Sequence, residues 1–470
     1  MKTLFRIDKQ RLSYTGGIQV VVVRPLEIKE GITAVMGPNG AGKTIFAKIV
    51  EKGWNFRTNR FISETGVKPE IRYMEFNDIH SWVGNAVGHY QQRYESSMND
   101  DVSTVAEILG EKAFSQRFRE LSKKFRLEDC TGKKINFLSS GELRKLLIIN
   151  VLLTSPDLLI LDNPYIGLDT ASRHELDDTL RHLPHSGTSV MLLLSDPGEA
   201  PAFTDHRIFC DSNEINVDFP IWQTESIPEP VTSHTCKESE PIQSGRLARP
   251  VLELTDCRVS YGSKTVLDKV NWTVLEGERW SLSGPNGSGK STLLSLIFAD
   301  NPKAYSSRIK LFGRQRGTGE SIWDVKKDIG FVSPEMQLHF HGSGNVNTIV
   351  SNGLNDTVGL FVRPTSEQLD RGLDWLHRFG IGHLASRGYD SLSSGERQLV
   401  LVARSMIKEP ALLILDEPMH ALDPHNKALV TASIENLLRR HPEMALIMVT
   451  HNSDELPESI TRHFRLSHAT

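Results

Sequence analysis

Four short apolar runs, arranged as two pairs, are the strongest structural signal along the chain. They lie at residues 158–161, 190–194, 412–415 and 446–449, and turn residues bound each of them. Short continuous apolar runs are typical of strands that are buried on both faces of a parallel sheet. Mostly helical stretches are expected at about residues 79–134 and 338–389. The pattern therefore predicts an α/β fold built on parallel sheets.

The apolar runs belong to a long internal repeat. The motif LSSGE occurs at residues 138–142 and again 254 residues later (392 − 138), and LLILDNP and LLILDEP have the same separation (416 − 162). A chain of 470 residues suits two domains of about 200 residues each. We predict a first domain at 1–210, a linker at 211–249 and a second domain at 250–470. The linker contains four prolines among Glu, Ser and Thr residues, which is typical of an extended surface segment.

The composition limits the kinds of partner and ligand that the chain is expected to bind. Lys plus Arg number 54 against 58 acidic residues, a net charge of −4, so the basic excess of a nucleic-acid binder is missing and no nucleic-acid partner is expected. The four cysteines form no CxxC pair, which argues against a zinc or iron–sulfur site and for a reducing cytoplasm. The N-terminal residues lack the apolar core of a signal peptide. Apolar runs stay shorter than the ~18 residues of a membrane span, so direct insertion into a membrane is not expected.

Two glycine-rich loops carry the first chemical signal. They read GPNGAGKT from Gly37 and GPNGSGKS from Gly284, and their lysines are 247 residues apart (290 − 43). Glycines let the backbone approach a phosphate closely, and the amides at the following helix start point inward. The lysines add charge at the β and γ phosphates, and the next hydroxyl suits Mg²⁺. The predicted nucleotide-binding residues are Gly37, Pro38, Asn39, Gly40, Ala41, Gly42, Lys43 and Thr44, and Gly284, Pro285, Asn286, Gly287, Ser288, Gly289, Lys290, Ser291 and Thr292.

The aspartates that end two of the apolar runs predict the metal side of each site. Asp162 and Asp416 are expected at the carboxyl edge of the sheet beside the loops, where they hold Mg²⁺ with Thr44 and Ser291. Asn163 follows the first aspartate and Glu417 follows the second. A carboxylate can accept a proton from water, whereas a neutral amide cannot. The sequence therefore indicates two nucleotide sites, of which only one has a base.

The LSSGE motifs allow two interpretations. Ser139, Ser140, Gly141 and Glu142, and Ser393, Ser394, Gly395 and Glu396, both contain the capping box of an ordinary helix start. A helix start also presents free amides that can bind phosphate. Each half would then have two phosphate-binding helix starts. The economical arrangement is a head-to-tail pair of domains, in which each lends its second helix start to the nucleotide of the other.

Three further positions complete the candidate sites. Tyr14 and Tyr261 each lie 29 residues before a loop lysine (43 − 14; 290 − 261). Their rings either stack on adenine or pack at the rim of the domain. His451 follows the apolar run at 446–449, where its ring could bind the γ-phosphate, and Ser195 is the matching residue of the first half.

With these residues the chain resembles the ATP-binding cassette superfamily over nearly its whole length. The loops, the LSSGE signatures, the strand-ending aspartates, Leu168-Asp169 and Leu422-Asp423, and the switch histidine stand in the order of that family. The resemblance implies two P-loop NTPase domains, each with a mixed or parallel sheet core, a β-rich subdomain and a helical signature subdomain. It also implies ATP and Mg²⁺ as ligands. Residues 305–333 are similar to tandem cassette proteins that are associated with bacterial molybdate transport.

The resemblance implies composite sites that form when two such halves close on each other. The sequence leaves open closure within one chain or between two chains, and the short linker favours closure within one chain. The hydrolytic site joins Tyr261, Lys290, Ser291, Asp416, Glu417 and His451 to the first signature. The impaired site joins Tyr14, Lys43, Thr44, Asp162, Asn163 and Ser195 to the second signature. Glu417 is expected to polarise the attacking water, and His451 to steady the γ-phosphate. The impaired site is either a long-lived ATP clamp or a decayed remnant.

Three functions remain open. The first is the ATPase of a molybdate-type import system, peripheral to the inner face of the plasma membrane through a permease. The second is a regulatory or mechanochemical ATPase without a transport role. The third is a ribosome-associated translation factor. The family usually has a glutamine after the strand that follows the glycine loop, where it senses the membrane partner, but Phe76 and Pro334 stand there. This departure favours the second function, and the proline-rich linker and Asn163 argue against the third.

Overall fold

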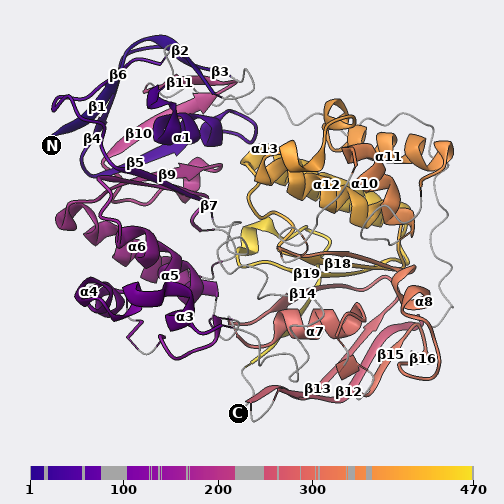
Figure 1. The fold of residues 1–470 in the computed structure, drawn as a ribbon. Helices are drawn as coiled ribbons and strands as arrows, with labels where there is room; N and C mark the ends of the chain where they lie inside the picture. The colour runs from indigo at the N-terminus through magenta and orange to yellow at the C-terminus, as the bar shows by residue number, and fades with distance from the viewer. Residues whose placement is uncertain are drawn as a thin grey trace. The chain divides into compact units, whose positions relative to one another are not determined.

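The computed structural model divides into two compact units, which correspond to a first half and a second half of the sequence apart from residues 421–424 (Figure 1). The described residues are 2–14, 19–55, 59–75, 103–217 and 248–467, except 126, 129, 136, 137, 139, 166, 167, 169, 262, 263, 286, 302, 305, 306, 335, 337–343 and 356–362. The first half comprises the described residues up to 217, and the second half those from 248 onward.

The first half is built on two sheets. The strands are β1 (Thr3–Ile7), β2 (Gln10–Ser13), β3 (Gln19–Val22), β4 (Leu26–Lys29), β5 (Ile32–Met36), β6 (Phe61–Ile62), β7 (Ile71–Glu75), β8 (Leu158–Asp162), β9 (Ser189–Leu194), β10 (His206–Asp211) and β11 (Glu214–Asn216). A small sheet has the order β4-β1-β6, and an eight-stranded sheet has the order β2-β3-β11-β10-β5-β9-β8-β7. The run β10-β5-β9-β8-β7 is parallel throughout, so the carboxyl ends of β5, β8 and β7 share one edge.

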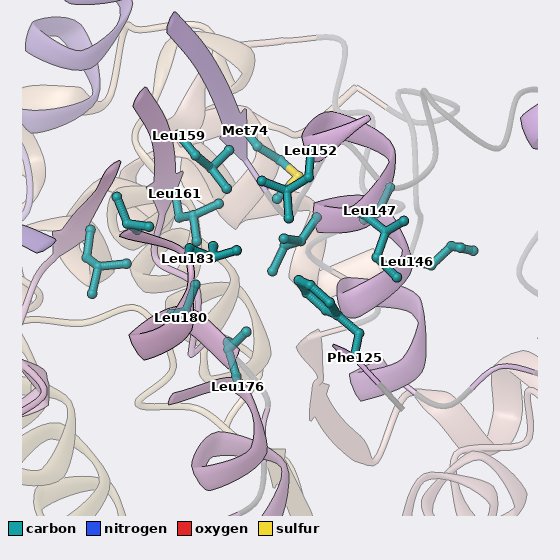
Figure 2. Close-up of a cluster of buried hydrophobic side chains, with 14 of the residues drawn as sticks. Met74, Phe125, Leu146, Leu147, Leu152, Leu159, Leu161, Leu176, Leu180 and Leu183 are labelled. Carbon is teal, nitrogen blue, oxygen red and sulfur yellow. The ribbon is translucent and has the colours of Figure 1, made fainter. Parts of the chain in front are cut away.

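Helices cover both faces of the parallel run in the first half. They are α1 (Lys43–Lys52), α3 (Val105–Leu109), α4 (Gln116–Lys124), α5 (Ser140–Leu152) and α6 (Thr170–His182). Alternate strand residues face opposite sides: Leu158 and Ile160 join the core cluster that contains α1. Leu159 and Leu161 join the cluster that contains α5 and α6. Figure 2 shows this second cluster, with Met74 of β7 beside Leu152 of α5.

The second half repeats this plan with fewer strands. Its strands are β12 (Pro250–Tyr261), β13 (Lys264–Leu275), β14 (Arg279–Ser283), β15 (Ile309–Leu311), β16 (Arg314–Gln315), β17 (Ile329–Val332), β18 (Leu412–Asp416), β19 (Ala445–Val449) and β20 (Arg462–Arg465). The helices are α7 (Lys290–Ile297), α8 (Ile322–Lys326), α10 (Val346–Ser351), α11 (Ser366–Arg378), α12 (Ser394–Met406) and α13 (Pro424–Arg440). An antiparallel sheet of order β13-β12-β15-β16 accompanies a parallel sheet of order β17-β18-β19-β14-β20.

The structure confirms the predicted α/β fold. All four apolar runs form buried parallel strands, namely β8, β9, β18 and β19. The described parts of the two predicted helical stretches contain α3 and α4, and α10 and α11. Residues 79–102 of the first stretch, 338–343 and 356–362 of the second stretch, and 218–247 of the predicted linker lie outside the described residues. The sheet of the first half continues past residue 210, because β11 pairs with β10 and β3.

The helices in the described part of the chain include none that is long and apolar enough to cross a membrane.

Candidate functional site

The glycine loop of the first half joins the end of β5 to the start of α1 and holds its lysine inward. Lys43 Nζ donates to the carbonyl oxygens of Gly37 at 2.6 Å and Pro38 at 2.8 Å. Gly42 has a φ of 94°, and a Cβ there would lie 2.6 Å from Asn213 Oδ1. A side chain at this position would be strained by both the backbone and its neighbour. The glycine is therefore required for the loop to close over the lysine.

The loop of the second half repeats this geometry between β14 and α7. Lys290 Nζ donates to the carbonyl oxygens of Gly284 at 2.6 Å and Pro285 at 3.1 Å. A Cβ on Gly284 would lie 2.4 Å from the carbonyl oxygen of Leu466. Within the described residues, the buried hydroxyl of Ser288 has no hydrogen-bond partner. Asn286 of the predicted loop lies outside the described residues.

The loop lysine of the first half is buried, so its ammonium group needs negative partners to stay charged. Desolvation lowers the pKa of Lys43, and the nearby charge of Asp162 opposes that shift. A buried ammonium needs negative partners, because burial without them disfavours its charged form. Triphosphate oxygens would supply such partners. The cradle in which the lysine sits therefore fits a nucleotide.

Asp162 is the centre of a hydrogen-bonded group in the first half. Its Oδ2 accepts from Thr44 Oγ1 at 2.7 Å and from the Tyr73 hydroxyl at 2.8 Å. Its Oδ1 accepts from Asn163 Nδ2 at 3.1 Å. The predicted pair of Mg²⁺ residues, Thr44 and Asp162, is thus brought together. The oxygen ligands that this pair offers are of the kind that Mg²⁺ prefers.

The second half places a carboxylate where the first half has an amide. Glu417 Oε1 lies 3.6 Å from His451 Nε2, and within the described residues that oxygen has no hydrogen-bond partner. Burial raises the pKa of Glu417 well above its ordinary value, and the charges of Asp416 and Glu455 raise it further. A carboxylate oxygen that has no donor within the described residues is suited to accept a proton from water. Ser291 is the second residue of α7, and Asp416 ends β18.

The same strained backbone presents these two different side chains. Asn163 has a φ of 48° and Glu417 a φ of 50°. The backbone N–H groups of Asn163 and Glu417 donate to the carbonyl oxygens of Leu193 at 3.0 Å and Val449 at 2.9 Å, respectively. A left-handed residue costs about 1–3 kcal/mol and persists where the surroundings require it. In the first half, Ser195 Oγ donates to Asn163 Oδ1 at 3.5 Å, so the predicted counterparts also lie together.

The signature motifs begin helices, as predicted. Ser393 and Glu396 form a complete capping box at the start of α12, in which Ser393 N donates to the Glu396 carboxylate at 2.8 Å. In the first half, α5 begins at Ser140 and Glu142 pairs with Lys133 at 3.0 Å. Ser139 lies outside the described residues. The predicted exchange of signatures between the halves stays a prediction.

The two candidate adenine-stacking residues both lie where a strand ends. Tyr14 is half-buried and packs against the core cluster that α1 covers. Tyr261 ends β12. The predicted stacking of either ring on adenine stays a prediction.

Sequence reasoning missed four residues that contact these groups. Tyr73 and Glu75 lie on β7 beside Asp162, and Glu455 raises the pKa of Glu417. Gln398 is fully buried in α12, and its Nε2 donates to the carbonyl oxygens of Glu417 at 3.3 Å and Pro418 at 3.0 Å. The alignment of the repeated strands could have drawn attention to Tyr73 and Glu75. No pattern in the sequence distinguishes Gln398 from any other glutamine in a helix.

Comparison with protein families gives a match in each half. A family model described as "ABC transporter" matches residues 26–166 and residues 267–420. These matches contain the glycine loops, the signature motifs and the strand-ending aspartates. The family match and the geometry therefore point to the same residues.

Two relatives match over nearly the whole chain. The ABC transporter ATP-binding protein ModF of Escherichia coli is 33% identical, with 91% of this chain and 89% of the relative aligned. An uncharacterised ABC transporter ATP-binding protein of Schizosaccharomyces pombe is 29% identical, with 91% of each chain aligned.

Among solved structures, a ribosome-bound archaeal ABCE1 has a TM-score of 0.59 at 20% identity and covers 98% of this chain and 78% of that one. An RNase-L inhibitor has a TM-score of 0.51 at 20% identity, with coverage of 97% and 87%. These structures share the fold with this chain.

Proposed function

The chain belongs to the ABC transporter family, whose ATP-binding domain it contains twice, and on that premise we propose that it is a Mg²⁺-dependent ATPase with unequal sites. The second half hydrolyses ATP, and the first half holds it. We also propose a division into two domains, in which the first ends with β11 at residue 216 and not at 210, and the second spans 250–470. The observation that carries this proposal is the contrast between Glu417 with His451 and Asn163 with Ser195 at equivalent places.

The proposed chemistry of the second half follows from the environment of Glu417. Because its pKa is raised, Glu417 in its ionised form is a stronger base than an ordinary surface carboxylate. It would accept the proton of the attacking water at Oε1, the oxygen that faces His451 Nε2. His451 would steady the terminal phosphate. Bound Mg²⁺ would neutralise charge that develops on the phosphates, with Ser291 and Asp416 as the residues that hold it.

The first half lacks this base but retains the binding parts. Lys43 and Thr44 occupy the same places as Lys290 and Ser291, and Asp162 would hold Mg²⁺ with Thr44. Asn163 cannot accept a proton from water at neutral pH. We therefore propose that ATP stays long in the first site while the second site turns over.

Nucleotide occupancy after a single turnover tests the proposal. The full chain is loaded with radiolabelled ATP and Mg²⁺, freed of excess nucleotide, and analysed for retained ATP and ADP over time. One retained ATP per chain, alongside turnover that depends on Glu417, is expected. Retention of ADP alone, or of no nucleotide, would overturn the assignment of the first site.

We further propose that the ATPase serves a transport system through a membrane partner, in keeping with relatives named ABC transporter ATP-binding proteins. Molybdate is the solute to test first, on the sequence resemblance alone. Affinity purification of the full chain from membranes and from cytosol tests this role. Recovery of permease subunits supports it. Ribosomal proteins would redirect the function to translation.

A regulatory ATPase is the second candidate, because neither half has the glutamine that senses a membrane partner. Pro334 stands at this position directly after β17 and Ser333. Phe76 lies outside the described residues. Recovery of neither permease subunits nor ribosomal proteins would favour this candidate.

A further inference from the structure

The first half contains a second carboxylate at the same sheet edge, on a neighbouring strand. Strands β7 and β8 are parallel, and Glu75 is the register partner of Asp162. The Tyr73 hydroxyl lies 2.8 Å from Asp162 Oδ2 and 3.3 Å from Glu75 Oε2. Two carboxylates therefore converge on one phenol, which has a single proton to donate.

These side chains lie on the face of the sheet where the phosphates are expected. Residues that alternate along a strand share a face, so Tyr73 and Glu75 are on the side that α1 covers. Tyr73 packs against the same core cluster as Phe46 of α1. Thr44, in the first turn of α1, reaches the same Asp162 oxygen as Tyr73. Glu75 is therefore directed to the start of α1, beside the residues proposed to hold Mg²⁺.

The second half has neutral residues at the two corresponding positions. Strands β7 and β17 both begin opposite the first leucine of an LLILD strand, at Ile71 and Ile329. The offset of 258 (329 − 71) aligns Tyr73 with Phe331 and Glu75 with Ser333. Phe331 stacks on Phe298 with ring centroids 4.4 Å apart. Ser333 Oγ accepts from the amide of Met336 at 3.2 Å.

The second carboxylate occupies a different position in each half. Each half has a second acidic residue near its strand-ending aspartate, namely Glu75 beside Asp162 in one half and Glu417 after Asp416 in the other. In the second half the extra carboxylate follows the aspartate along the chain. In the first half it lies across the sheet, one strand away.

We propose that Glu75 is a positioning residue for Mg²⁺ in the first half, and that Tyr73 sets its orientation. The proposal rests on the proposed ATP-holding function of that half. A second negative charge near Thr44 and Asp162 attracts the cation and orients its water ligands. Outer groups of this kind typically change metal affinity by roughly 10–100-fold. Because Glu75 is not at the position of Glu417, it strengthens retention of the metal–nucleotide complex without supplying the base for hydrolysis.

The experiment isolates the first half within the full chain. A Lys290→Ala background disables the loop of the second half. Binding of a fluorescent, non-hydrolysable ATP analogue is then titrated with Mg²⁺ and, separately, in EDTA. Mn²⁺ binding is followed by electron paramagnetic resonance as a readout of the metal itself. Glu75→Gln is expected to weaken Mg²⁺ and Mn²⁺ binding by roughly 10–100-fold. Tyr73→Phe should act in the same direction with a smaller effect.

Only the titration with metal shows a loss of affinity if the proposal holds. Without a metal, Glu75→Gln removes a negative charge near the phosphates, so analogue affinity stays equal or rises. A variant that merely misfolds would lose affinity in both. Glu70→Gln is the matched control, because Glu70 precedes β7 at its amino end and is exposed, and its metal affinity should match the parent.

Each remaining outcome has one meaning. Unchanged metal affinity in Glu75→Gln, with normal analogue binding, overturns the role of Glu75 and leaves the proposed function intact. Failure of the Lys290→Ala parent itself to bind the analogue overturns the proposed holding function, and the inference falls with it.

Discussion

The carboxyl ends of β8 and β18 have the same backbone and different chemistry. Both are followed by a left-handed residue whose amide bonds to the next strand. In the first half that residue is Asn163, which donates to Asp162. In the second half it is Glu417, whose Oε1 faces His451. The fold thus preserves the geometry of two sites, while single side chains decide whether the site can accept a proton.

The largest expected effect is on turnover in the second half. Glu417→Gln keeps the shape of the side chain and removes the proton acceptor, so the steady-state ATPase rate should fall by roughly 10²–10⁴-fold. Asn163→Ala should change the rate little, because an amide provides no base. Phosphate release measures both. Retained turnover in Glu417→Gln would show that the site in the second half is wrongly assigned.

Grafting tests whether the first half lacks only these side chains. Asn163→Glu with Ser195→His, placed in the Glu417→Gln chain, should raise the ATPase rate roughly tenfold over Glu417→Gln alone. The shared φ near 50° should present the new carboxylate as Glu417 is presented. The control is the same graft with Lys43→Ala. If the graft gives no gain, the halves differ in more than the two side chains.

Sequence alone predicted the parts of this comparison that depend on local patterns. The LLILD strands, the glycine loops and the capping box of α12 follow from short-range rules, and the difference between Asn163 and Glu417 is visible in the aligned repeat. The contacts of Tyr73 and Gln398 were not predicted, because they depend on strand register and on which helix face meets the loop after the strand. Such contacts join residues about 20 to 90 positions apart.

The helix after each signature offers a further comparison. In the second half, the buried Gln398 donates to the carbonyl oxygens of Glu417 and Pro418. In the first half, Arg144 Nη1 donates to the carbonyl oxygen of Pro164 at 2.6 Å, and the two positions are 254 apart (398 − 144). Both side chains hold the turn that follows the strand-ending aspartate, but only one of these turns carries a base.

Gln398→Met should therefore lower kcat by about tenfold while KM changes little, because the turn no longer fixes Glu417. Arg144→Met is the matched variant. Both substitutions should lower the free energy of unfolding by a similar amount, but Arg144→Met should not lower kcat. Steady-state kinetics and thermal unfolding of both variants measure the two effects. Equal losses of kcat would show that the helices act only on stability.

The smallest expected effect is on the pH dependence of stability, which should differ between the two halves. Because the folded pKa of Glu417 lies above its unfolded value of 4.5, the unfolded chain releases this proton first as pH rises. The glutamate thus contributes a loss of stability that begins near that value and is complete above the folded pKa. Glu417→Gln removes this loss. At neutral pH the unfolding transition of the second half should shift upward by roughly 2–4 °C, on the order of 1 kcal/mol.

Calorimetry of the full chain at several pH values measures this shift. The gain should vanish below about the unfolded pKa, where wild-type Glu417 is protonated in both states. Asn163→Asp in the first half is the informative counterpart, because it adds a charge beside Asp162 and should lower stability at neutral pH. A Glu417→Gln gain that persists unchanged at acid pH would come from packing. Such a gain would not support the idea that a buried carboxylate with a raised pKa distinguishes the second half from the first.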